Sequence, residues 1–232
     1  MLYGLKVIQN HLNRRETSDA RVRVLSLGIG VGILERIFIK KFGAEIVGVD
    51  KDPDVMSFAY TYFRSSLVDD EWKGLTLISG YCALSVLSEL SNGISKSNLK
   101  LVEACRVYKG LRYNVVLLNI IDHDDLSGWG ACVPPRHFVE KSIFDKIKGL
   151  LDPEGAFVMQ VIVPDICYEE KFILLGGCFR IVFKIALNHK SKYVLVATDS
   201  AVFASGENKP GRTSDVITSL VTCSFNIDET FY

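Results

Sequence analysis

The sequence contains no long uninterrupted apolar segment, no excess of charge of one sign and no paired cysteines. Its 232 residues hold no window of about 18 apolar residues, so we expect no membrane span. Lys plus Arg and Asp plus Glu both number 27, a balance that gives no support to a nucleic-acid partner. The six cysteines form no CxxC pair and have no histidine at ligand spacing. We therefore expect reduced thiols, no metal site and a cytoplasmic location.

The composition fits a globular domain, with 48% hydrophobic and 23% charged residues. The first residues, MLYGLKVIQNHLNRR, lack the apolar core and the cleavage site of a signal peptide. Residues 1–204 are expected to form one domain. Residues 205–232 are polar, carry only weak structural signals and are expected to form a C-terminal extension. These features do not determine the oligomeric state.

Strand-like apolar runs alternate with helix-like segments along most of the chain. Such alternation predicts an α/β fold with a mostly parallel, seven-stranded sheet and helices on both faces. Strands are expected at residues 21–28, 45–50, 75–80, 113–121, 154–163, 179–187 and 192–198. Ligands of such sheets bind at the carboxyl ends of the strands, so the residues that follow the strands are the candidate site.

The stretch VLSLGIGVG, residues 24–32, runs from a strand into a glycine loop and then a helix. Backbone N–H groups in such a loop can face a ligand, and glycine allows close approach. The dinucleotide pattern GxGxxG would need a glycine at Ile33. The observed spacing of Gly28, Gly30 and Gly32 is GxGxG, which is more usual where the ligand is S-adenosylmethionine or a relative of it.

Asp50 ends the second expected strand, 22 residues after Gly28. A carboxylate at this place can accept hydrogen bonds from both ribose hydroxyls of a nucleoside. In the alternative interpretation the glycines form only a tight turn and Asp50 caps the next helix. Asp52 is the better cap, because it directly precedes Pro53, and this leaves Asp50 for the ligand.

Several segments resemble the spermidine-synthase-like branch of the Rossmann methyltransferases. They are LGIGVGILE, VGVDKDPDV, YNVVLLNI and VPPRHFVEKSIFDKIKGLLDPEGAFVMQVI, of which Pro134 to Phe157 is the most specific part. Within that branch the chain is most similar to the C-terminal domain of the methyltransferases that modify translation elongation factor 1-alpha. The resemblance covers roughly residues 1–200.

The resemblance implies an S-adenosylmethionine-dependent enzyme that methylates an amine, either an N-terminal amine or a lysine, of a protein. An elongation factor is the implied substrate, and neither a nucleic acid nor a membrane is implied as a partner. By position, the residues implied to hold the cofactor are Gly28, Ile29, Gly30 and Gly32 for the methionine part, Asp50 and Lys51 for the ribose, Gly80 and Tyr81 for the adenine, and Asn119 near the sulfonium.

The chain departs from this branch at two places. Relatives usually have an aspartate at the position of Gly80. They also have Asp-x-Asp where this chain has Asn119, Ile120 and Ile121. An asparagine accepts a hydrogen bond through its carbonyl oxygen but carries no negative charge.

The acidic loop after Asn119 offers a replacement for the lost charge. Asn119 and Asp122 are therefore the catalytic candidates. Asp122 and the two acids that follow it would attract the amine, or they are simply solvated. His123 and His137 are further candidate bases, or they have no catalytic role.

Three functions remain open on the sequence. The first is an active protein methyltransferase. The second is a methyltransferase-fold binding module that has lost catalysis, which the missing acids at positions 80, 119 and 121 favour. The third is a polyamine synthase of the spermidine type. A polyamine needs several acids to hold it, and Asn119 speaks against this third function.

Overall fold

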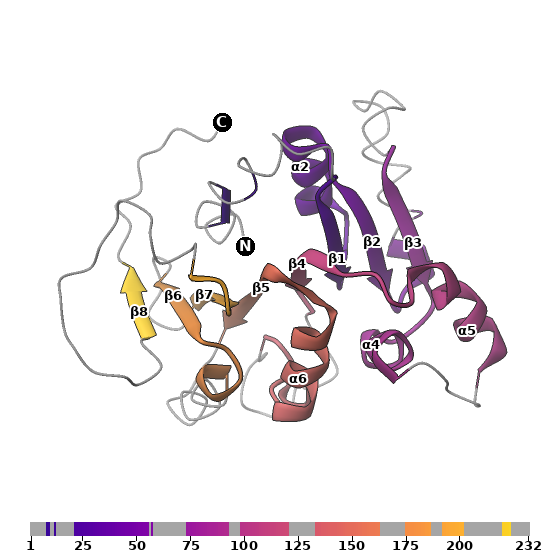
Figure 1. Cartoon of the computed structure of the whole chain (residues 1–232). Helices are drawn as coiled ribbons and strands as arrows, with labels where there is room; N and C mark the ends of the chain where they lie inside the picture. The colour runs from indigo at the N-terminus through magenta and orange to yellow at the C-terminus, as the bar shows by residue number, and fades with distance from the viewer. Residues whose placement is uncertain are drawn as a thin grey trace.

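The computed structural model shows one eight-stranded sheet with helices packed against it (Figure 1). It describes residues 8–9, 12, 21–55, 57, 73–92, 98–120, 133–162, 175–186, 192–201 and 220–223. The strands are β1 (Arg23–Leu27), β2 (Glu45–Asp50), β3 (Leu75–Ser79), β4 (Tyr113–Leu118), β5 (Leu151–Ile162), β6 (Ile181–Ala186), β7 (Lys192–Thr198) and β8 (Leu220–Cys223).

The strand order is β3-β2-β1-β4-β5-β7-β6-β8. Strands β1 to β5 pair in parallel, β7 runs antiparallel to both β5 and β6, and β8 pairs in parallel with β6. The predicted α/β fold and mostly parallel sheet are confirmed, but the sheet is mixed because of β7. The eighth strand lies within the segment that the sequence predicts to be an extension, where apolar periodicity is weak.

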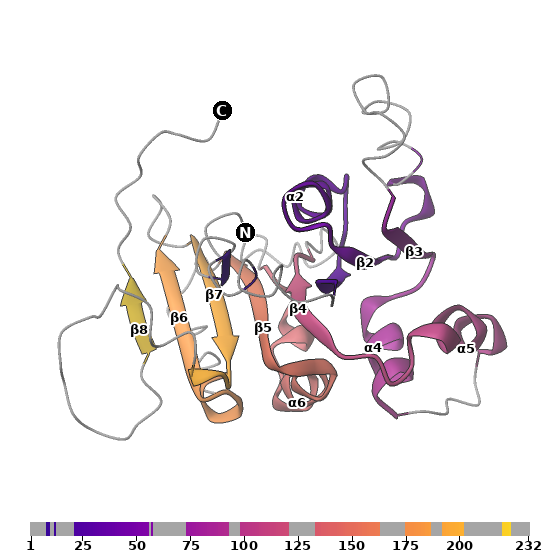
Figure 2. The same ribbon diagram turned by 45° about the horizontal axis from the view of Figure 1, so that its top comes forward.

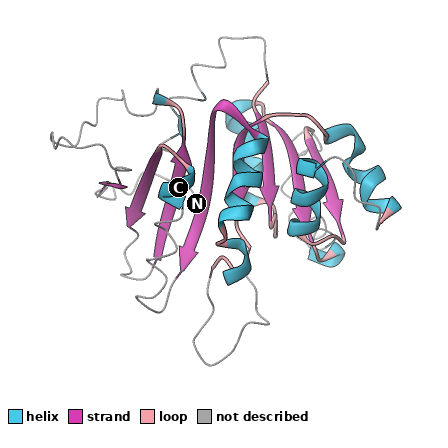
Figure 3. Ribbon diagram, turned by 60° about the horizontal axis from the view of Figure 1, so that its bottom comes forward, coloured by secondary structure: helices cyan, strands magenta, loops and turns pink. Residues whose placement is uncertain are grey.

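Helices cover both faces of the sheet. Figure 2 shows α2 on one side and α4, α5 and α6 on the other, and Figure 3 shows helices lying across one face. The helices are α2 (Ile33–Phe42), α4 (Ala83–Asn92), α5 (Leu99–Cys105) and α6 (Lys141–Leu150), with short 3-10 turns η3 (Arg106–Tyr108) and η4 (Arg136–Phe138). No helix in the described ranges combines the length and the apolar character needed to cross a membrane.

The two-residue period of the strands divides the core between the two faces. In β1, Leu25 and Leu27 belong to the cluster under α4 and α6, whereas Val24 belongs to the cluster under α2. All six residues of β4 are buried, as expected for a central parallel strand. The carboxyl ends of β1 and β4 are therefore held rigidly by core packing on both sides.

Helix α5 lies in a segment for which no strand is predicted from the sequence. It is only seven residues long, but Asn98 caps it by accepting a hydrogen bond from the backbone N–H of Leu101 at 3.1 Å. Leu101 and Cys105 form its buried face. An asparagine followed by apolar residues four apart is the signal that could have identified it.

Candidate functional site

The strand order reverses between β1 and β4, which lie side by side while their connections leave in opposite directions. In open α/β sheets a crevice forms at such a point, at the carboxyl ends of the strands. Gly28 directly follows β1, and Asn119 directly follows β4. The Asn119 N–H donates to the backbone oxygen of Leu27 at 2.9 Å, which fixes the two strand ends to each other.

Gly28 and Gly30 are required by the shape of the loop after β1. Their φ angles are +81° and +53°, in the left-handed region that favours glycine. A Cβ atom on Gly28 would lie 2.7 Å from the backbone oxygen of Asn119, whereas one on Gly30 would meet no atom within 4 Å. The close approach at Gly28 is thus made by the protein's own chain, and the open space lies at Gly30.

Asp50 holds the glycine loop in place. Its Oδ2 accepts a hydrogen bond from the N–H of Gly30 at 3.0 Å, and its Oδ1 accepts one from the N–H of Asp52 at 3.1 Å. Asp52 in turn accepts from the N–H of Asp54 at 2.9 Å, as predicted for the helix cap. Each carboxylate oxygen can accept a further hydrogen bond, so Asp50 still has capacity for a ligand.

These strand ends enclose a cavity of about 380 Å³. Its lining consists of Gly28, Gly30, Val49, Asp50, Lys51, Asp52, Val55, Cys82, Ala83, Asn119, Ile120, His137 and Phe138. Gly28, Gly30, Asp50, Lys51 and Asn119 are residues that the sequence predicts for the site. The fold thus brings together residues from β1, β2 and β4 that are far apart in the sequence.

Four other predicted site residues, Ile29, Gly32, Gly80 and Tyr81, are not among those that line this cavity. Ile29 is buried, and Gly32 forms the N-cap of α2. Gly80 donates its N–H to the backbone oxygen at the end of β2 at 2.9 Å. Tyr81 packs against the core on the side of α4. Asp122 lies outside the described residues.

Cys82, Ala83 and Phe138 are among the lining residues for which no role is predicted from the sequence. Cys82 and Ala83 lie at the start of α4, directly after the predicted adenine-binding pair, and Phe138 comes from η4. The first two could have been found by extending the third strand end by two residues. Phe138 has the apolar character of a core residue, so the sequence gives no signal that one side of it faces the cavity.

A buried carboxyl group lies beneath the glycine loop. Glu35, in the first turn of α2, is 1% exposed, and its Oε1 accepts a hydrogen bond from Ser26 Oγ of β1 at 2.5 Å. Burial raises the pKa of Glu35 from 4.5 to about 7. The hydrogen bond from Ser26 opposes this shift, and the neighbouring Asp50 carboxylate adds to it.

We expect Glu35 to make the stability of the protein fall as the pH rises from about 4.5 through 7. In this window the unfolded carboxyl loses its proton more readily than the folded one, so ionisation favours the unfolded state. The loss should be on the order of 3 kcal/mol in the free energy of unfolding. Glu35→Gln should abolish this dependence in denaturant titrations at a series of pH values. Glu140→Gln, at an exposed position, should retain it, and an unchanged slope in the Glu35 variant would contradict the assignment.

Two curated proteins that are similar to the chain carry the name of a methyltransferase. The chain is 29% identical over 212 residues to the eEF1A lysine and N-terminal methyltransferase of Danio rerio, covering 90% of this chain and 26% of that protein. It is 28% identical over 180 residues to the protein of the same name from Xenopus laevis. The chain therefore spans about a quarter of the length of these relatives. No protein-family model matches it.

Solved structures show the same arrangement of strands and helices. Human methyltransferase-like protein 13 in complex with SAH superposes with a TM-score of 0.66 at 21% identity, covering 91% of this chain and 83% of that one. The chain has a Rossmann-like methyltransferase fold. Spermidine synthase from Thermotoga maritima superposes with a TM-score of 0.55 at 15% identity and covers 85% of this chain. The resemblance drawn from the sequence motifs is confirmed by these relatives.

Proposed function

We propose that the chain is an S-adenosylmethionine-dependent protein methyltransferase that methylates an amine of a translation elongation factor in the cytoplasm. The observation that carries this proposal is the cavity at the reversal point of the sheet, which joins the glycine loop, Asp50 and Asn119. The names of the similar proteins support both the reaction and the elongation factor as substrate.

The residues present fit the cofactor. A cavity of about 380 Å³ is within the usual size of small-molecule sites. The open space at Gly30 suits the methionine part, and the remaining acceptor capacity of Asp50 suits the ribose hydroxyls. Lys51 would flank the ribose, and Gly80 and Tyr81 remain proposed neighbours of the adenine.

When bound, S-adenosylmethionine supplies a methyl group on a positively charged sulfur. The protein must bring an uncharged amine in line with that methyl group and keep water away. Asn119 lines the cavity with its backbone packed against Gly28, and its side-chain carbonyl oxygen can accept a hydrogen bond from the amine. We propose that Asp122 adds the negative charge that Asn119 lacks.

Incubation with S-adenosylmethionine and elongation factor 1-alpha tests this function. The products are read by mass spectrometry of intact protein and of peptides. We expect mass steps of one methyl group at an N-terminal amine or a lysine. Transfer of an aminopropyl group to putrescine from decarboxylated S-adenosylmethionine, with no methyl transfer to protein, would instead identify a polyamine synthase. Cofactor binding without transfer to any amine would identify a binding module.

The binding-module alternative rests on Asn119, because among the described residues no carboxylate lines the cavity at the end of β4. We expect Asn119→Asp to raise kcat/KM for methyl transfer by at least about tenfold, since the new charge would attract and orient the ammonium group. Asn119→Leu, of similar size but without the amide, should lower it. S-adenosylhomocysteine affinity, measured in parallel, separates an effect on methyl transfer from an effect on cofactor binding, since Asn119 also lines the proposed cofactor site. Equal, measurable transfer rates in all three proteins would remove Asn119 from the substrate site, and cofactor binding without transfer by any of them would favour the binding module.

A further inference from the structure

We propose that His137 accepts a proton from the substrate's ammonium group at the end of the cavity where Asn119 lies. This inference rests on the proposed methyltransferase function and assigns it a base. His137 lines the same cavity as Asn119, which ends β4, although 18 residues separate them in the sequence. His137 is also exposed, so a substrate that enters the cavity can reach its ring.

The segment that carries His137 is tied to the sheet. Val133 and Ile162 form an isolated antiparallel bridge, in which each donates its N–H to the other's backbone oxygen at 3.0 and 2.9 Å. Ile162 is the last residue of β5, and β5 pairs with β4. The bridge therefore brings the segment alongside the carboxyl end of β4, where Asn119 lies.

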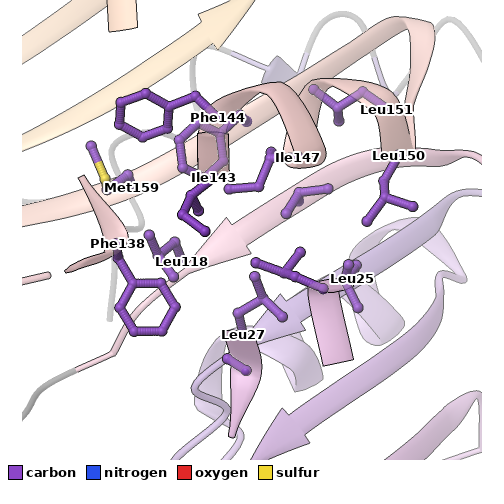
Figure 4. Packing of buried hydrophobic residues seen from close by; sticks show 14 of the residues in the cluster. Leu25, Leu27, Leu118, Phe138, Ile143, Phe144, Ile147, Leu150, Leu151 and Met159 are labelled. Atoms are coloured by element: carbon purple, nitrogen blue, oxygen red, sulfur yellow. The ribbon is translucent and has the colours of Figure 1, made fainter. Parts of the chain in front are cut away.

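Core packing fixes the position of His137 within this segment. Its neighbours Phe138 and Val139 are 2% and 1% exposed. Figure 4 shows Phe138 beside Leu118 at the end of β4. The rings of His137 and Phe138 lie 4.7 Å apart between centroids, at 42°. These contacts hold the segment, and with it the backbone of His137, beside the cavity.

The other titratable groups that line the cavity are poorer proton acceptors. They are Asp50, Lys51, Asp52 and Cys82. Carboxylates are weak bases at neutral pH, and lysine and cysteine side chains are ordinarily protonated there. An imidazole ordinarily changes its charge between about pH 5 and 8. Asp50 is also committed to the N–H groups of Gly30 and Asp52. Histidine is thus the lining side chain best suited to this proton transfer.

The step conserves charge and atoms. The substrate ammonium gives one proton to the ring nitrogen of His137, which becomes an imidazolium, and the amine becomes neutral. The amine nitrogen then forms a bond to the methyl carbon as the bond from that carbon to sulfur breaks. The products are a methylated ammonium and S-adenosylhomocysteine, and the imidazolium releases its proton to water.

His137→Ala separates this role from a structural one. We expect kcat/KM for methyl transfer to fall by about 100-fold at neutral pH, within the usual range for loss of a general base. The deficit should shrink at alkaline pH, where the amine is already neutral, and added imidazole should restore part of the rate. S-adenosylhomocysteine affinity should be unchanged. Glu140→Gln removes an exposed titratable group from the same segment and should keep the wild-type pH profile.

The outcomes distinguish the two proposals. Methyl transfer by wild type, together with a His137→Ala variant of the same rate and pH profile, would overturn the inference and leave the proposed function standing. An equal loss of kcat/KM in His137→Ala at all pH values, without rescue by imidazole, would also overturn the inference. The ring of His137 would then contribute only through its packing. Absence of transfer by wild type would overturn both.

Discussion

Asp50→Ala is expected to weaken binding of S-adenosylhomocysteine by about 100-fold or more. Each hydrogen bond donated to a charged acceptor contributes roughly 1.5–3 kcal/mol, and this is lost when the acceptor is removed. Two effects add here, because Asp50 is proposed to hold the ribose and is seen to hold the N–H of Gly30. The substitution therefore removes a ligand contact and also releases the glycine loop. Calorimetric titration measures both affinity and stoichiometry.

Asp52→Asn provides the matched control. It removes one negative charge from the same cavity lining, two residues away, and retains an oxygen that can cap the helix at Asp54. We expect its affinity for S-adenosylhomocysteine to stay close to that of wild type. Equal losses in the two variants would mean that only net charge matters, and an unchanged affinity in Asp50→Ala would remove Asp50 from the site.

Gly28→Ala is expected to lower the free energy of unfolding by about 2–5 kcal/mol. A left-handed backbone conformation costs a non-glycine residue roughly 1–2 kcal/mol, and forcing an extra methyl group into a packed place costs a further 1–3. Both costs apply, since φ is +81° and the added Cβ would lie 2.7 Å from the backbone oxygen of Asn119. Chemical denaturation measures this loss.

Gly110→Ala separates the two costs. Gly110 has a φ of +77°, but an added Cβ would meet no atom within 4 Å, and this glycine does not line the cavity. Only the conformational cost of about 1–2 kcal/mol should remain there. If Gly28→Ala is no more destabilising than Gly110→Ala, the close contact between the ends of β1 and β4 is contradicted.

Much of the fold and five of the thirteen residues that line the cavity could be predicted from the sequence, because strand ends are local features. Asn119 interrupts the apolar run that forms β4, although the expected strand continues to residue 121, and the run that forms β2 ends at Asp50. Parallel pairing then places these ends on one edge of the sheet. No knowledge of side-chain packing is needed for this step.

The rest depended on tertiary contacts that leave no local pattern. His137 is a candidate base on the sequence, but its place at the cavity beside Phe138 depends on the pairing of Val133 with Ile162, and nothing in either segment indicates the other. The eighth strand likewise forms by pairing with β6 and not from strong periodicity of its own.

Helix α2 illustrates a second limit. Its periodicity predicts an apolar face through Ile33, Leu34, Ile37 and Phe38, yet Ile33 is 53% exposed and Glu35 is buried. A charged residue in the buried stripe misleads a pattern based on hydrophobicity. The partner that makes its burial tolerable, Ser26, lies in the middle of β1 and could not be identified from spacing.

Calorimetric titration of the purified wild-type chain with S-adenosylhomocysteine tests the central claim most directly. The structure predicts binding of one equivalent at the cavity formed by the glycine loop, Asp50 and Asn119. A titration that shows no binding to the folded chain would contradict the claim that this cavity is a nucleoside site.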